Sequence, residues 1–124
     1  TVYKGQLCFA ATTKASGREP WISDGTTQGT RLLLDVETGS KGSNPREMRG
    51  FKRLLFSAET STAGREPWVS NGTSAGTQLL RDVNQGTGSS DPKEFTLGDD
   101  FGRIYFAASV VLSSGAGSAA RRAS

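Results

Sequence analysis

Carboxylates give this chain its widest range of possible chemistry. Glu19 with Glu66, or Asp24 with Asp35, could place two carboxyl groups about 5 to 10 Å apart, the arrangement that glycoside hydrolysis needs. Histidine is absent from the sequence, which excludes Ser-His and Cys-His nucleophile pairs and histidine metal ligands. No Gly-Lys-Ser/Thr phosphate-binding loop follows a predicted strand. A carboxylate hydrolase is therefore the remaining catalytic hypothesis, and it is a remote one because these residues recur with the pattern described below. We expect a protein that is not an enzyme.

The same acidic residues are also candidates for calcium ligands. Asp24 and Asp35 in one stretch, and Asn71 and Asp82 in another, supply the side-chain oxygens that calcium prefers. The alternative is that Asp24 and Asn71 cap their own turns through hydrogen bonds to the backbone. No dense Asp-x-Asp run is present. The turn explanation is therefore favoured, and we expect no cofactor, with calcium as the alternative.

Two arginine and tryptophan pairs suggest a sugar-binding surface. Arg18 with Trp21, and Arg65 with Trp68, would offer an aromatic face and hydrogen-bond donors at two sites, as in a multivalent lectin. The competing interpretation buries each tryptophan between neighbouring sheets, where a large flat ring contributes most. The second interpretation is favoured, and glycans are kept as a possible partner class.

An N-glycosylation acceptor sequence occurs once in the predicted turns. Asn71-Gly72-Thr73 has the Asn-x-Thr pattern. The corresponding first position in the other copy of this turn is Asp24. We expect a glycan on Asn71 only if a eukaryote secretes the protein.

An internal repeat organises these residues. The pentapeptide Gly-Arg-Glu-Pro-Trp occupies residues 17–21 and 64–68, 47 residues apart. The match continues at the same offset through the Ser-Asp/Asn-Gly-Thr turn and the Asp-Val pair to a Ser-x-Pro sequence. An apolar pentapeptide occurs three times, at residues 7–11, 54–58 and 104–108. Periods of 20 to 50 residues are typical of solenoids, propellers and arrays.

Each period predicts short strands and no helix. Asp-Gly and Asn-Gly dipeptides favour tight hairpin turns, and the apolar pentapeptides are continuous runs, as in strands buried on both faces. Four short strands per period are typical of a propeller blade. We therefore predict an all-β fold of propeller-type blades, each with four antiparallel strands, about two and a half blades in all. The expected strands are residues 1–4, 6–12, 19–23 and 30–36, then 47–51, 53–59, 66–70 and 77–83, then 94–97 and 102–109.

These boundaries divide the chain into four parts. Residues 1–45 and 46–92 are each predicted to form a blade with its crossover loop, and residues 93–109 part of a third blade. Residues 110–124 consist largely of small residues with two arginines and predict a disordered tail. Because closed propellers have roughly four to eight blades, we expect a fragment, or an oligomerising piece, of a larger propeller.

Composition excludes several classes of partner. The pI of about 9.4 reflects a net charge of only +3, and residues 1–108 hold 13 basic against 12 acidic side chains. A nucleic-acid partner is not expected without a basic stripe. Cys8, the single cysteine, excludes an internal disulfide and is expected to be a buried, inert thiol. No apolar run approaches the roughly 18 residues of a membrane span, so we expect no membrane insertion.

The pattern Glu-Pro-Trp-x-Ser-Asp-Gly-Thr-x-x-Gly-Thr resembles the ELWxxDGT repeat family over residues 1 to about 109. Departures are Pro20 and Pro67 in place of the family's leucine and Asn71 in place of its aspartate. The resemblance implies propeller-like repeats of secreted or surface proteins and supplies no catalytic residue. The expected function is a non-catalytic structural or adhesive module, extracellular or at the cell surface. Its expected partners are copies of itself or neighbouring blades, and a carbohydrate-binding lectin is the alternative function.

Overall fold

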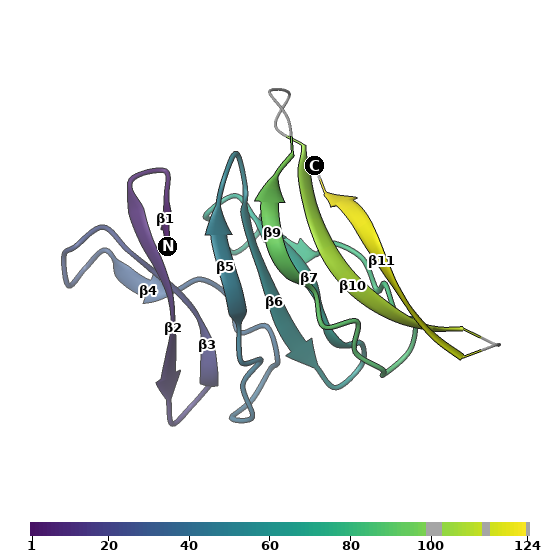
Figure 1. Ribbon diagram of the computed structural model, residues 1–124. Helices are drawn as coiled ribbons and strands as arrows, with labels where there is room; N and C mark the ends of the chain where they lie inside the picture. Colours follow the sequence, from purple (N-terminus) through teal and green to yellow (C-terminus); the bar gives the residue numbers. More distant parts are fainter. Residues whose placement is uncertain (99–102, 113–114, 124) are drawn as a thin grey trace.

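The computed structural model describes residues 1–98, 103–112 and 115–123. These residues form eleven β-strands in three antiparallel sheets, which confirms the all-β prediction. Within this described part of the chain, no helix is long and apolar enough to cross a membrane. Figure 1 shows the three sheets following one another in chain order, from the purple N-terminal strands to the yellow C-terminal strand.

The first sheet contains β1 (Val2–Tyr3), β2 (Gln6–Thr13), β3 (Gly17–Ser23) and β4 (Thr30–Leu32), hydrogen-bonded in that order. Consecutive strands pair as antiparallel neighbours, so the sheet is a simple meander. The Asp-Gly turn predicted from the sequence lies between β3 and β4.

The second sheet repeats this order with β5 (Arg46–Gly50), β6 (Leu54–Thr60), β7 (Gly64–Ser70) and β8 (Thr77–Leu79). The third sheet contains β9 (Lys93–Leu97), β10 (Ile104–Leu112) and β11 (Gly115–Ala123), with β10 in the centre. Residues 33–45 link the first sheet to the second, and residues 80–92 link the second to the third; these segments are called the first and second connecting loops.

Two apolar cores lie between successive sheets. Side chains alternate between the two faces of a strand. In the second and third sheets the front face is the one toward the preceding sheet, and the back face is the opposite one. The matching faces of the first sheet take the same names. The front face of the second sheet carries Leu54, Phe56 and Ala58, which pack against the back face of the first sheet. That back face contributes Tyr3, Cys8, Ile22 and Leu33. The second core joins the back face of the second sheet to the front face of the third, through Leu55, Val69, Phe95, Ile104, Phe106 and Ala108.

Burial of the central strand agrees with the sequence pattern. Five consecutive residues of β6, 54–58, are buried, because Leu54 and Phe56 enter one core and Leu55 the other. A strand covered on both faces needs a continuous apolar run rather than an alternating one. Cys8 is also buried, as expected, and burial raises the pKa of its thiol. No sheet of the described residues closes on itself.

The expected fourth strands are longer than those observed. The sequence pattern predicts strands over residues 30–36 and 77–83, whereas β4 and β8 end at Leu32 and Leu79. Leu33 N–H still donates to the Pro20 carbonyl at 2.9 Å, and the backbone then turns toward the glutamate of β3. Leu33 is buried, and Val36, Leu80 and Val83 are partly buried, by packing against the cores rather than by strand pairing.

The expected disorder of the tail is wrong for residues 115–123. β10 extends to Leu112, and β11 pairs with it from Leu112↔Gly115 to Ile104↔Ala123. Low apolar content shows that a segment cannot form a core of its own, but strand pairing requires only backbone N–H and C=O groups. Residues 115–123 contain no proline, so each can pair with the otherwise open edge of β10.

Candidate functional site

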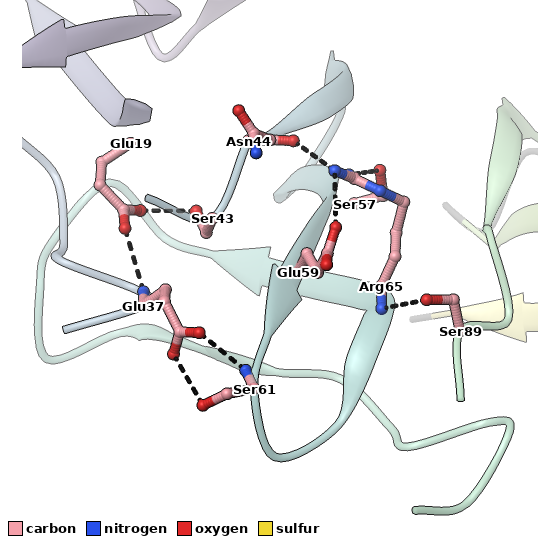
Figure 2. A network of polar contacts seen from close by, with 9 residues as sticks. All are labelled: Glu19, Glu37, Ser43, Asn44, Ser57, Glu59, Ser61, Arg65 and Ser89. Carbon is pink, nitrogen blue, oxygen red and sulfur yellow. Dashed lines mark hydrogen bonds and ion pairs between the residues drawn. The ribbon is translucent and has the colours of Figure 1, made fainter. Parts of the chain in front are cut away.

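The glutamates of the two Gly-Arg-Glu-Pro-Trp segments are fully buried. The Glu19 carboxylate accepts hydrogen bonds from Val36 N–H at 3.2 Å, Glu37 N–H at 3.0 Å and the Ser43 hydroxyl at 2.5 Å. All three donors belong to the first connecting loop, so one side chain of β3 holds both ends of that loop. Figure 2 shows the carboxylate of Glu19 between Glu37 and Ser43.

Glu66 repeats this arrangement in the second sheet. Its carboxylate accepts from Val83 N–H at 3.0 Å, Asn84 N–H at 3.2 Å and the Ser90 hydroxyl at 2.5 Å. Burial raises the pKa of Glu66 above its ordinary value, and this effect outweighs the three hydrogen bonds, which lower it. The pKa of Glu19 is raised for the same reasons. These two carboxylates form hydrogen bonds within the protein and are inaccessible to a substrate, which speaks against a hydrolytic role for this pair.

The glycine that begins each segment lies directly beneath the loop. A Cβ at Gly17 would lie 2.5 Å from the Gly42 nitrogen, and a Cβ at Gly64 would lie 2.7 Å from the Thr87 carbonyl oxygen. Both glycines also have a positive φ of 72°, which L side chains rarely adopt. Glycine is required at both positions for the loop to approach closely enough to reach the glutamate.

Each connecting loop also binds the sheet that follows it. The Ser43 carbonyl accepts from Glu59 N–H on β6 at 2.8 Å, and the Ser90 carbonyl accepts from Ser109 N–H on β10 at 2.7 Å. These serines therefore join two sheets, since the hydroxyl of each binds the glutamate of the sheet before and the carbonyl binds the strand after. The recurrence of Ser-x-Pro at the offset of 47 residues is the sequence signal for this role, although the pattern alone does not show what the serine binds.

Glu37 makes a second contact between the first two sheets. Its carboxylate accepts from Ser61 N–H at 2.8 Å and is 3.4 Å from the Ser61 hydroxyl, at the turn between β6 and β7. Both interactions are exposed to solvent, so their contribution is smaller than that of the buried serine contacts. Figure 2 shows this contact beside the Glu19 network.

Arg65 is a buried cation on the back face of the second sheet, with 5% of its surface exposed. Its guanidinium donates to the Ser57 hydroxyl at 2.9 Å and to the Asn44 carbonyl at 2.8 Å (Figure 2). Glu59 lies 3.9 Å away and is half exposed, so it offsets the charge only weakly. Burial is the largest of the effects that lower the pKa of Arg65. Arg18, the matching residue of β3, is exposed.

Arginine and tryptophan do not form the sugar-binding surface considered above. Trp21 pairs with Phe9 and Arg18 pairs with Thr12, and a spacing of three residues places side chains on opposite faces of a strand. Trp68 likewise stacks on Phe56 at a centroid distance of 6.5 Å within the first core, whereas Arg65 lies on the other face with Ser57. The odd spacing was visible in the sequence and could have excluded a shared platform.

The candidate calcium ligands are separated in the same way. Asp24 follows β3 at the Ser23↔Thr30 end of the hairpin, whereas Asp35 lies beyond the Trp21↔Leu32 end. Asp24 Oδ1 accepts from Thr26 N–H at 2.9 Å and from the Thr26 hydroxyl at 2.6 Å, which are the turn hydrogen bonds proposed as the alternative. These bonds lower the pKa of Asp24.

Asn71 and Asp82 occupy the equivalent places in the second sheet. Asn71 Oδ1 accepts from Thr73 N–H and the Thr73 hydroxyl. Asp35 and Asp82 each accept a loop N–H at one carboxylate oxygen, while the buried Oδ1 of each has no hydrogen-bond partner. Within the part of the chain that the structure describes, no three acidic or cysteine side chains gather in a group able to hold a metal ion.

The acceptor sequence at Asn71 lies in an exposed turn between β7 and β8. Its side-chain oxygen is held by Thr73, and Gly76 packs against its amide group. The turn also receives a hydrogen bond from Arg31 of the first sheet, whose guanidinium donates to the Gly72 carbonyl at 2.9 Å. The structure thus places the acceptor at the surface, in a turn that the neighbouring sheet helps to hold.

A pocket of about 310 Å³ opens beside Arg65, between the starts of the second and third sheets. Its lining includes the basic residues Arg46 and Lys93 and the acidic residues Glu47 and Asp91. Charges of both signs line this space, which does not favour a particular ligand. The best-defined polar site of the molecule is therefore the junction between successive sheets.

Comparison with known proteins supplies no relative for this chain: no family model, no curated protein sequence and no solved structure matches it.

Proposed function

We propose that this chain is a non-catalytic structural or adhesive module of an extracellular or cell-surface protein, built from propeller-like repeats of the ELWxxDGT type. The observation that carries the proposal is the use of Glu19 and Glu66. Each is the most chemically versatile residue of its segment, and each is buried and committed to three hydrogen bonds with a connecting loop. Repeated polar residues that hold sheets in series suit a scaffold better than a catalyst.

Repetition gives such a scaffold its use. Sheets joined by equivalent loops present equivalent outer turns, such as those at Asp24 and Asn71, at regular intervals. Surfaces repeated in this way can bind a partner at several points. Once one contact has formed, the second forms at a high effective concentration, which raises the overall affinity. The resemblance to repeats of secreted proteins supports an extracellular or surface location.

Substitution of the two glutamates tests the structural role. Glutamine in Glu66→Gln keeps one acceptor oxygen for Val83 and Ser90 but turns an amide donor toward Asn84 N–H. We expect both Glu66→Gln and Glu19→Gln to lower the free energy of unfolding by about 1 to 3 kcal/mol, the cost of a buried donor without an acceptor. Urea unfolding followed by circular dichroism measures this, with the exposed Glu47→Gln as control.

A hydrolysis screen and a glycan array on the same variants test the other functions. We expect no turnover of chromogenic glycosides and no saturable glycan binding by the wild type. Turnover that disappears in Glu66→Gln, while the fold is retained, would support the hydrolase instead. Saturable glycan binding that Trp21→Ala removes would establish the lectin, because Trp21 lies on an outer face of the array.

A further inference from the structure

Three matching positions of the repeat differ in burial, since two of the side chains are buried and one is exposed. Leu7, Leu54 and Ile104 begin the three matching apolar runs, on the front faces of the first, second and third sheets. Leu54 is 0% exposed and Ile104 is 1% exposed, whereas Leu7 is 51% exposed. Phe9 and Ala11, next to Leu7 on this face, are only half-buried, while their counterparts Phe56 and Ala58 are fully buried.

The cover over the two buried front faces has the same composition each time. The back face of the preceding four-stranded sheet supplies the apolar part, through Ile22 and Leu33 at the first junction and Val69 and Leu80 at the second. The preceding connecting loop supplies a serine carbonyl to the strand backbone, at Glu59 and at Ser109 respectively. A complete sheet with its connecting loop is therefore the unit that covers a front face.

The front face of the first sheet also has polar groups at the positions that contact a preceding connecting loop in the other two sheets. Thr12 occupies the position of Glu59 and Ser109, and it lies beyond the end of β1, where a loop carbonyl can reach its N–H. Lys14 is exposed and occupies the position of Ser61, which receives the Glu37 carboxylate at the first junction. An ammonium group there offers N–H donors and a positive charge to a carboxylate at the Glu37 position of an incoming loop.

We propose that the front face of the first sheet is a docking site for the back face of one further complete sheet of this same kind, together with its connecting loop. A second copy of this chain does not supply that unit. In each copy the back faces of the first and second sheets are already covered, and the described part of the third sheet has three strands. The occupant is therefore an additional 47-residue segment. This inference rests on the proposed function, since it names the partner of the scaffold.

The offset allows a direct test. A second copy of residues 1–47 is placed ahead of Thr1, so that its Glu47 precedes Thr1 just as Glu47 precedes Met48, the residue that matches Thr1. Leu7→Cys is introduced in the original segment, with Cys8→Ala in both copies. Labelling of this thiol by iodoacetamide is compared in the extended and unextended chains, with Leu54→Cys as the buried reference. Leu97→Cys, which replaces a 53% exposed side chain of the third sheet, is the control.

We expect extension to slow labelling at position 7 at least about tenfold, toward the rate at position 54, because a buried thiol reacts only after local opening. Labelling at position 97 stays unchanged. An extended chain that shows the circular dichroism of added strands but labels at position 7 as fast as the unextended chain overturns the proposal. If this extension does not fold, a copy of residues 1–94 is placed ahead of Thr1 instead, because it spans two periods of 47 residues and ends at the matching position. Failure of both to fold also counts against the docking site.

Sedimentation of the unextended chain separates the other occupants. We expect no concentration-dependent dimer that Leu7→Lys abolishes; such a dimer would make a second copy the occupant and overturn the proposal. Rapid labelling in the folded extended chain leaves the proposed function intact, since the two observed junctions do not depend on this face. Saturable glycan binding, by contrast, refutes the proposed function whether or not position 7 becomes protected.

Discussion

The first and second sheets have the same strand order, and β3 and β7 differ at a single residue, yet the two sheets differ in what surrounds them. The hydrogen bonds of Glu19 to the first connecting loop are the same as those of Glu66 to the second, with three donors each. Contacts that require a neighbour differ. Leu54 lies under the first sheet whereas Leu7 is half exposed, and Arg65 reaches the Asn44 carbonyl whereas Arg18 is exposed. The comparison separates what one segment encodes from what the junction between sheets adds.

The largest difference is expected at the matched leucines. Leu54→Ala removes a fully buried side chain from the first core and should lower the free energy of unfolding by about 2 to 5 kcal/mol. Leu7→Ala removes a side chain that is already half in water and should cost less than about 1 kcal/mol. Urea unfolding of the two variants measures both values. Similar losses of unfolding free energy in the two variants would mean that the covering sheet does not determine how much each leucine contributes to stability.

A smaller difference is expected at the matched arginines. Arg65→Met keeps the aliphatic length but leaves the Ser57 hydroxyl and the Asn44 carbonyl without their donor, which should cost about 1 to 3 kcal/mol. Arg18→Met changes an exposed side chain and should remain within about 0.5 kcal/mol of the wild type. Thermal unfolding of the pair measures the effect. A stabilised Arg65→Met variant would show that the desolvation of the guanidinium exceeds the value of its hydrogen bonds.

The smallest effect concerns pH, and the two sheets should show it alike. Burial raises the pKa of Glu66, so the folded state holds its proton more tightly than the unfolded state does. The resulting stabilisation is fully present below the ordinary value of about 4.5 and is lost as the pH rises through the folded-state pKa. The stability difference between wild type and Glu66→Gln should therefore shrink as the pH rises from 4. Glu19→Gln should show the same dependence on pH. A stability difference between wild type and either variant that widens as the pH rises would contradict the raised pKa of that glutamate.

Strand order, the continuous apolar strand and the burial of Cys8 followed from the sequence, because each depends on a local pattern of residue types. The capping of its own turn by Asp24 followed for the same reason. The platform of Arg18 and Trp21 was wrong, because a spacing of three residues places the two side chains on opposite faces of a strand.

Features that depend on a distant partner could not be predicted. To predict the role of Ser43, one must know that its loop lies between Glu19 and β6. The pairing of residues 115–123 requires knowing that β10 extends past its apolar run and leaves an edge for a further strand. Composition describes what a segment can bury by itself, and it does not show which backbone lies beside it.

Amide hydrogen exchange of the unmodified chain, resolved by NMR, tests most directly the claim that the connecting loops join successive sheets. Glu59 and Ser109 donate their N–H groups to the loop carbonyls of Ser43 and Ser90, while Thr12 occupies the same position at the open end. The account predicts slow exchange at Glu59 and Ser109 and fast exchange at Thr12, by at least about a hundredfold relative to Glu59. Equal protection of Thr12 and Glu59, or fast exchange at all three, would contradict it.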